Sequence, residues 1–117
     1  MKENNVLQIA VKAADDKKAE NITVLDMKGI SLISDYFLIC NGNSEKQVQA
    51  IATEIKKSAQ AQDIELKRLE GFDQARWVLI DLDDVVVHVF HKDERVYYNL
   101  EKLWGDAPTI DVEEVLA

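Results

Sequence analysis

Cysteine and long apolar runs are the two features that this sequence most lacks. Its one cysteine, Cys40, excludes an internal disulfide and a cysteine-based zinc cluster. Because Cys40 ends the apolar run YFLIC, we expect a small buried residue there rather than a nucleophile. No apolar run approaches the roughly 20 residues that a membrane helix needs, and residues 1–16 lack the pattern of a signal peptide. We therefore expect a cytoplasmic protein without a membrane partner.

Basic residues are also few in comparison with acidic ones. The chain has 22 acidic and 14 basic residues, which give it a net charge of −8. A firm grip on a phosphate backbone needs clustered lysine and arginine, so the total charge predicts little direct contact with nucleic acid. A basic partner suits this charge, although solubility alone explains the charge better.

The remaining composition is that of a folded domain. The 117 residues suffice for one hydrophobic core, and 47% of them are hydrophobic. Apolar residues at helical or alternating spacing predict three helices and five strands. The helices are expected at 6–14, 44–62 and 94–104, and the strands at 22–27, 35–40, 63–71 and on both sides of an acidic turn at 83–84. This order predicts an α/β protein of the α+β kind, in which residues 1–117 form one domain and helices pack on a mixed five-stranded sheet.

Residues 106–117 form an acidic tail for which two arrangements are open. They contain Pro108, the only proline, and four acidic residues without a basic one. The tail either lies loosely over the surface or docks through its apolar side chains, which are Ile110, Val112, Val115 and Leu116.

The stretch ARWVLIDLDDVVVHVFH, residues 75–91, predicts a hairpin with two unlike faces. If the loop has an even number of residues, such as Asp83 and Asp84, side-chain alternation gathers all the aliphatic residues on one face. That face holds Val78, Ile80, Leu82, Val85, Val87 and Val89. The other face is mixed and pairs Trp77 with Phe90, Leu79 with His88 and Asp81 with Val86. A three-residue loop with a bulge would break this arrangement.

The mixed face has two interpretations. In the first, a layer of helix covers it, Trp77 belongs to the core and His88 is a buried imidazole with its hydrogen bonds satisfied. In the second, the face is partly exposed and Trp77 is an anchor for another macromolecule. Tyr98 would be its neighbour in that case, and otherwise it is an ordinary surface tyrosine. It lies off the apolar stripe of the helix expected at 94–104, which is formed by Val96, Tyr97, Leu100, Leu103 and Trp104.

An enzymatic site is poorly supported. Asp81, Asp83 and Asp84 next to the NGNS motif suggest a nucleotidyltransferase, whose paired acids bind two metal ions. However, Asp83 and Asp84 are better explained as turn residues, and the motif has no Gly-Ser pair. His88 and His91 are three residues apart on a strand and so point to opposite faces, which disfavours a shared metal. We expect no catalytic residues, no cofactor and no metal.

Two longer stretches are similar to a known family. SDYFLICNGNSEKQVQAIATEI at 34–55 and EGFDQARWVLIDLDDVVVHVFHKDERVYYNLEKLWGDAP at 70–108 closely resemble the ribosomal silencing factor family, the RsfS or Iojap-like proteins. The combination is specific: a tryptophan enters a valine-rich hairpin, and an arginine, two adjacent tyrosines and Leu-Glu-x-Leu-Trp follow. One departure is Asp83, where such proteins usually carry glycine in the turn.

The resemblance implies a non-enzymatic protein that binds large-subunit ribosomal protein number fourteen. Such proteins prevent the small subunit from joining, and so repress translation when nutrients are short. It also implies a nucleotidyltransferase-like topology without the catalytic site, a homodimer off the ribosome, and a binding surface made of Trp77, Asp81, His88 and Tyr98. Two alternatives are a large-subunit assembly factor that uses the same surface and a residual nucleotidyl-transfer enzyme.

Overall fold

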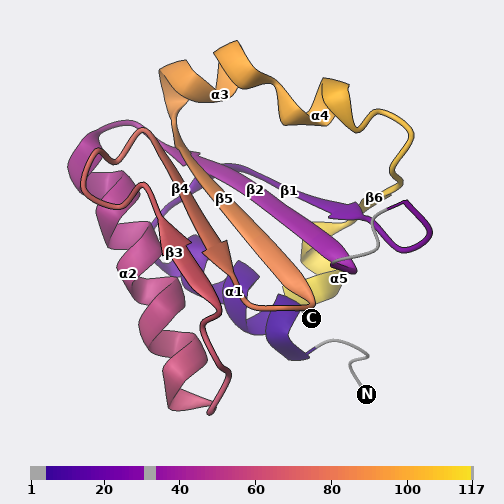
Figure 1. Ribbon diagram of the computed structural model, residues 1–117, viewed down its shortest axis with the longest axis horizontal. Helices are drawn as coiled ribbons and strands as arrows, with labels where there is room; N and C mark the ends of the chain where they lie inside the picture. Colours follow the sequence, from indigo (N-terminus) through magenta and orange to yellow (C-terminus); the bar gives the residue numbers. More distant parts are fainter. Residues whose placement is uncertain (1–4, 31–33, 117) are drawn as a thin grey trace.

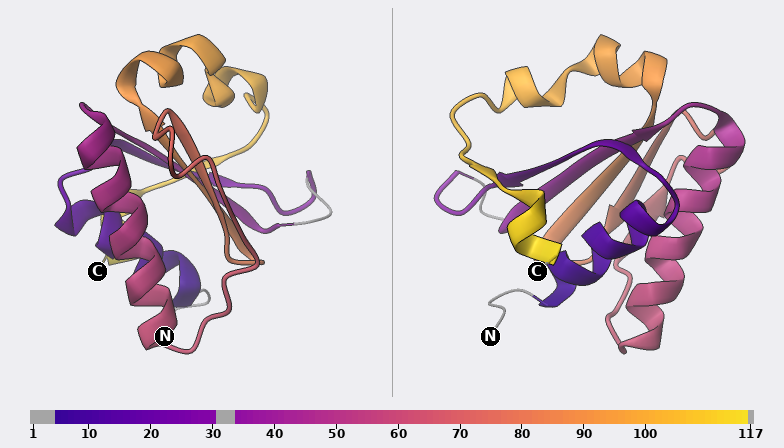
Figure 2. Two further views of the ribbon diagram at one scale, coloured as in Figure 1. Left: turned by 60° about the vertical axis from the view of Figure 1, so that its left-hand side comes forward. Right: turned by 180° about the vertical axis from the view of Figure 1, so that it is seen from behind.

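A mixed six-stranded sheet lies between two unequal layers of helices (Figures 1 and 2). The computed structural model describes residues 5–30 and 34–116, without the side chains of residues 5, 101 and 103. The strands are β1 (Glu20–Asp26), β2 (Tyr36–Gly42), β3 (Arg68–Glu70), β4 (Trp77–Asp81), β5 (Val85–His91) and β6 (Thr109–Ile110). The helices are α1 (Asn5–Asp16), α2 (Glu45–Ala61), α3 (Lys92–Tyr98), α4 (Leu100–Leu103) and α5 (Val112–Leu116). Helices α1, α2 and α5 cover one face, and α3 and α4 lie over the other (Figure 2).

The sheet has the order β3-β4-β5-β2-β1-β6. Its central pair, β2 and β5, is parallel, and the other neighbours are antiparallel. The expected mixed sheet packed by helices is therefore confirmed, but five strands was one too few. The sixth strand is formed by Thr109 and Ile110, which pair with Leu25 and Val24 of β1. Two residues are too short a stretch for an alternating pattern to reveal.

The hairpin has the register that side-chain alternation predicts. Trp77 pairs with Phe90, Leu79 with His88 and Asp81 with Val86, and the Leu82 amide donates to the Val85 carbonyl at 2.9 Å. Asp83 and Asp84 therefore form a two-residue loop, in which Asp83 takes the left-handed conformation with φ 77°. The amides of Asp35 and Tyr36 donate to the Asp84 carbonyl, which ties the turn to the start of β2.

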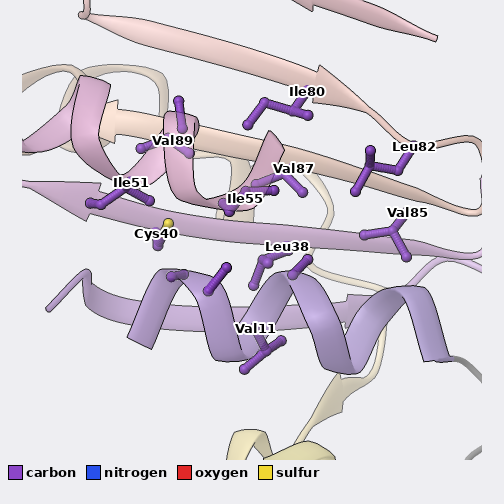
Figure 3. Close-up of a cluster of buried hydrophobic side chains, with 14 of the residues drawn as sticks. Val11, Leu38, Cys40, Ile51, Ile55, Ile80, Leu82, Val85, Val87 and Val89 are labelled. Atoms are coloured by element: carbon purple, nitrogen blue, oxygen red, sulfur yellow. The ribbon is translucent and has the colours of Figure 1, made fainter. Parts of the chain in front are cut away.

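The aliphatic face of the hairpin forms the floor of the main core (Figure 3). Its six residues are at most 2% exposed, and side chains of α1 and α2, such as Val11, Ile51 and Ile55, lie against them. Each fully buried side chain of this size contributes roughly 1.5–3 kcal/mol through the hydrophobic effect. This packing fixes β4 and β5 against α1 and α2.

Helix α2 begins where the sequence predicts a capping box. The Gln47 amide donates to Ser44 Oγ at 3.1 Å, and Asn43, one residue before the cap, donates its amide to Gln47 Oε1 at 2.7 Å. The helix buries the expected stripe of Val48, Ile51, Ala52, Ile55 and Ala59. It therefore leaves a long polar face in solvent.

Two expected elements are shorter or broken. The strand expected at 63–71 is limited to Arg68–Glu70, at the edge of the sheet. The helix expected at 94–104 breaks at Asn99, which has φ 48° and donates its amide to the Arg95 carbonyl at 2.9 Å. Asparagine adopts this left-handed conformation more readily than most residues, so it ends α3 at low cost.

The break redirects the apolar side chains of this segment. Leu100 is buried and Trp104 half-buried in a second core cluster, whereas Val96 is 80% exposed and Tyr97 78% exposed. The helical spacing predicts that Val96 and Tyr97 belong to a buried stripe, and their exposure shows that this prediction is wrong. The side chain of Leu103, expected in the same stripe, lies outside the described residues.

The acidic tail is built into the fold. Beyond β6, helix α5 lies against α1, and Ile110, Val112, Val115 and Leu116 are half-buried against the main core. In the described part of the chain, no helix is both long and apolar enough to cross a membrane.

The loop between β3 and β4 requires glycine at position 71. A Cβ added at Gly71 (φ +79°) would lie 2.2 Å from the Trp77 carbonyl oxygen, whereas one at Gly29 (φ +83°) would meet nothing within 4 Å. We expect Gly29→Ala to cost about 1 kcal/mol through left-handed strain alone. Gly71→Ala should cost about 3 kcal/mol or more, because a backbone clash is added to the strain. Urea denaturation of both variants measures the difference; equal losses would contradict the clash.

Candidate functional site

Aromatic side chains from three elements meet on the mixed face of the hairpin. Trp77 begins β4, Phe90 lies opposite it on β5, and Tyr98 ends α3. The Trp77 ring centroid lies 5.0 Å from that of Phe90, in a stacked arrangement, and 4.6 Å from that of Tyr98. Tyr97 extends the set, with its ring 5.0 Å from Tyr98 and nearly perpendicular to it. We call Trp77, Tyr97 and Tyr98 the aromatic surface.

The aromatic surface is exposed at its outer part and anchored at its inner part. Tyr97 is 78% and Tyr98 44% exposed, while Trp77 is half-buried and Phe90 is fully buried beneath it. The Trp77 ring packs against the second core cluster and is only half-buried, so it is partly core and partly exposed. Amphipathic rings held in this way are typical of protein interfaces.

His88 supports Trp77 from inside the sheet. It is 5% exposed and accepts a hydrogen bond from Trp77 Nε1 at its Nδ1, at 3.2 Å. The Phe37 ring packs edge-on against it, with centroids 4.9 Å apart. Its Nε2 is buried and has no hydrogen-bond partner among the described residues. The imidazole is therefore buried but only half satisfied, and it fixes the orientation of the indole above it.

Burial keeps His88 uncharged. Desolvation lowers its pKa from 6.5 to about 4, because a charged imidazolium would lose its hydration without gaining a counter-ion. A neutral ring can accept the indole proton, whereas an imidazolium cannot. The Trp77–His88 hydrogen bond therefore depends on the neutral form.

Asp81 does not join this group. It ends β4, four residues from Trp77, which places it about 13 Å away along the strand. Its Oδ1 accepts the Asp83 amide at 2.9 Å, and its Oδ2 lies 3.6 Å from Arg68 Nε on the neighbouring edge strand. Asp81 thus closes the hairpin turn and pairs with β3, and the structure brings only Trp77, His88 and Tyr98 of the four expected site residues together.

A buried arginine positions α3 above the sheet. Arg95 is 9% exposed, and its guanidinium donates to the Asn21 carbonyl, to Asn41 Oδ1 at 3.1 Å and to Thr23 Oγ1 at 3.1 Å. These contacts hold α3 to the ends of β1 and β2, along an open cleft of about 760 Å³. The Arg95 side chain points toward β1 and the Tyr98 side chain toward β4. The hydrogen bonds of Arg95 on one side of α3 therefore fix the position of Tyr98 on the other side.

Ion pairs close the loop that precedes Trp77. Arg76 Nη2 donates to Glu94 Oε1 of α3 at 2.6 Å, and Arg76 Nη1 lies 3.6 Å from Glu45 Oε2 of α2. The hydrogen bond with Glu94 raises the pKa of Arg76 further above its ordinary value. These pairs link α2, α3 and the loop around the aromatic surface.

A metal cluster and a reactive thiol are two further kinds of reactive group to consider among the described residues. Within residues 5–30 and 34–116, no three His, Cys, Asp or Glu side chains are placed to hold a metal ion. Burial raises the pKa of the Cys40 thiol to about 12, so it is a poor nucleophile at neutral pH. The fold and the site together define a small α+β domain that carries an exposed aromatic surface.

Comparisons with known proteins identify the family. The family model described as "Ribosomal silencing factor during starvation" matches residues 1–117. The chain is 73% identical over 117 residues to the ribosomal silencing factor RsfS of Halalkalibacterium halodurans, covering 100% of both chains. It is 67% identical over 113 residues to the protein of the same name from Bacillus subtilis, covering 97% of this chain and 96% of that one.

A solved structure agrees with these matches. A crystal structure of a protein from Bacillus halodurans has a TM-score of 0.82 and 74% identity, covering 91% of this chain and 96% of that one. The chain belongs to the ribosomal silencing factor family.

Sequence reasoning missed the exposure of Val96 and Tyr97. A helical wheel places both on the buried stripe, because it assumes that the helix continues to Trp104. The one available signal is Asn99 within YYNLEKLW, since asparagine is a common residue at a left-handed helix end.

The buried imidazole predicts a pH-dependent stability. The unfolded chain protonates His88 near its ordinary pKa of 6.5, but the folded chain does so only near 4. Stability should therefore fall as the pH drops from about 6.5 to about 4, by about 3 kcal/mol from this residue, and the contribution should be constant above that window. His88→Asn keeps an acceptor near Trp77 Nε1 but does not titrate, so this part of the slope should vanish.

The matched control is His91→Asn, which removes the other imidazole of the chain and can still cap α3, as His91 Nδ1 does for the Asp93 amide. Free energies of unfolding from denaturant titrations at several pH values compare the three proteins. A slope that survives in His88→Asn would show that other groups cause it.

Proposed function

We propose that this protein binds the large ribosomal subunit through the aromatic surface and keeps the small subunit from joining it. The proposed contact is large-subunit ribosomal protein number fourteen, and the proposed effect is repression of translation under nutrient limitation. Family membership supports the ribosome as the target, since the relatives are named ribosomal silencing factors. We infer that the protein acts by occupying a surface and not by catalysis.

The observation that carries the proposal is the exposed but fixed set of aromatic rings. Tyr98 and Trp77 are held by Phe90 beneath them and by the Trp77–His88 hydrogen bond, so little side-chain freedom is lost when a partner covers them. Aromatic residues of this kind account for a large share of binding energy at interfaces. A partner rich in basic residues also suits a chain with a net charge of −8.

The roles within the proposed site differ. Tyr98 and Tyr97 would contact the partner with the largest exposed area, and Trp77 would anchor the centre. His88 is a positioning residue, because it is too buried to be touched and acts through the indole. Asp81 would lie at the periphery, next to Arg68.

Sedimentation of large subunits mixed with the protein tests the proposal. Wild type should move with the large subunit and reduce the amount of joined ribosomes when small subunits are added. Trp77→Ala and Tyr98→Ala should each weaken binding by about 2 kcal/mol or more, which is at least about 30-fold in Kd. Wild-type protein that stays at the top of the gradient sinks the proposal.

The matched control is Ile30→Ala, which removes another exposed apolar side chain, 40% exposed, at the opposite end of the sheet. It should bind and silence as wild type does. Because Trp77 also packs against the core, melting curves must show that each variant is folded at the temperature used. Binding without loss of subunit joining would favour an assembly role instead. We also propose that the protein is a homodimer off the ribosome, and sedimentation of the protein alone tests this.

Asp81 has a separate test. If Asp81 meets a basic residue of the partner, Asp81→Lys should weaken binding more at low salt than at high salt, because screening removes the repulsion. Asp81→Asn keeps an acceptor for the Asp83 amide and is the control for the turn. Equal affinity of Asp81→Lys and wild type at both salt concentrations removes Asp81 from the binding surface.

A further inference from the structure

A second surface, with a positive charge, lies on the polar face of α2. A shallow groove of about 370 Å³ runs between the end of α1, the exposed side of α2 and the loop before β4. Its walls include Lys17, Lys46 and Lys57, together with Gln49, Glu54 and Phe72. Three lysines and one glutamate give this lysine groove a net charge of +2 in a chain whose total is −8.

The spacing of the α2 residues makes the groove a continuous track. Lys46, Ala50, Thr53 and Lys57 lie at i, i+4, i+7 and i+11, so they form one stripe along the helix, and all four are exposed. The two lysines mark the ends of the stripe, about 16 Å apart along the axis, and the small side chains between them leave the floor open. The amino-terminal end of α2, where the helix dipole is positive, lies at the Lys46 end.

The lysines of the groove are available to a partner. Lys12 and Lys67 lie within 3.5 Å of Asp16 and Glu65, but in the described part of the chain no such pair engages Lys17, Lys46 or Lys57. The one acid of the groove, Glu54, accepts the Ser58 hydroxyl at 3.4 Å. The positive charge of the groove is therefore not neutralised by the protein itself.

A single loop lies between the groove and the aromatic surface. Gln49 Nε2 donates to the Phe72 carbonyl at 3.0 Å, which fastens the β3–β4 loop to α2. The same loop continues through Arg76, which pairs with both Glu45 and Glu94, and ends at Trp77. The loop thus separates the two surfaces, and a partner that covers Trp77 can extend over the loop to α2.

We infer that the lysine groove binds the phosphate backbone of ribosomal RNA beside the protein that the aromatic surface contacts. This inference rests on the proposed function, because it assumes the large subunit as the target. Unpaired lysines along one track are the usual means of holding a phosphate backbone, and Phe72 adds an apolar wall against which a base or ribose can lie. The contact would align the protein on the subunit without reading a sequence.

Removal of two charges tests the inference. The double variant Lys46→Gln/Lys57→Gln should bind purified large subunits less tightly than wild type at low salt. The slope of log Kd against log salt, measured from about 50 to about 300 mM, should fall by about 1.5, since each phosphate contact contributes about 0.7–0.9. An unchanged slope with unchanged Kd overturns the inference.

The matched control is Lys12→Gln/Lys67→Gln, which removes the same charge outside the groove. It should keep the slope of wild type. If the control loses as much slope as the groove variant, the effect belongs to the total charge and the groove has no special part.

Crosslinking decides between RNA and an acidic protein. A benzophenone amino acid in place of Ala50, between Lys46 and Lys57, should crosslink to RNA when the protein is bound to large subunits and irradiated. A crosslink to a ribosomal protein alone, or none from a variant that binds normally, overturns the inference. If Trp77→Ala weakens binding but the groove variant keeps the wild-type salt slope, the inference about the groove is rejected and the proposed function stands. If wild type binds no large subunits, both proposals are rejected.

Discussion

The register of the β4–β5 hairpin is the constraint on which the two sides of this molecule depend. Strict alternation sends Val78, Val87 and their aliphatic neighbours toward α1 and α2, and sends Trp77, His88 and Phe90 the other way. A shift by one residue would bury the indole and imidazole in the main core and expose the valines. The two-residue loop at Asp83 and Asp84, fastened to β2, prevents that shift. The same local geometry therefore specifies both the stability of the domain and the character of its exposed face.

Rigid placement of the aromatic surface comes from polar groups at its margins. Arg95 clamps α3 to β1 and β2, Arg76 joins α2 to α3, and Glu94 receives the Arg76 guanidinium. Each of these side chains lies at a junction between elements. Because surface pairs are worth little on their own, their effect here is to fix position more than to add stability. The tyrosines at the end of α3 are therefore held in place by contacts to other elements, because so short a helix would not be fixed by its own hydrogen bonds.

Periodic patterns and local capping motifs could be predicted from the sequence, and features that depend on distant contacts could not. The hairpin faces and the Ser44 cap follow from alternation and from local hydrogen bonding, so they could be predicted before the fold was known. The short strand β6 depends on its pairing with β1, which no local pattern contains, and the break at Asn99 has only the weak local signal of one asparagine. Within the site, proximity of Trp77, His88 and Tyr98 could be anticipated, but Asp81 shares their face and not their position. Net charge hid the lysine groove, because a sum over the chain carries no location.

Strand β6 and helix α5 pack against β1 and α1, which lie at the other end of the described chain. Strand β6 pairs with the side of β1 that β2 leaves open, and α5 lies on α1, so each of these amino-terminal elements lacks one neighbour until β6 and α5 are made. The parallel pairing of β2 with β5 likewise joins segments that are far apart along the chain. Such non-local contacts slow folding and postpone it until late in synthesis. A nascent copy of this protein therefore cannot complete its sheet until its carboxyl-terminal residues have left the ribosome that made it.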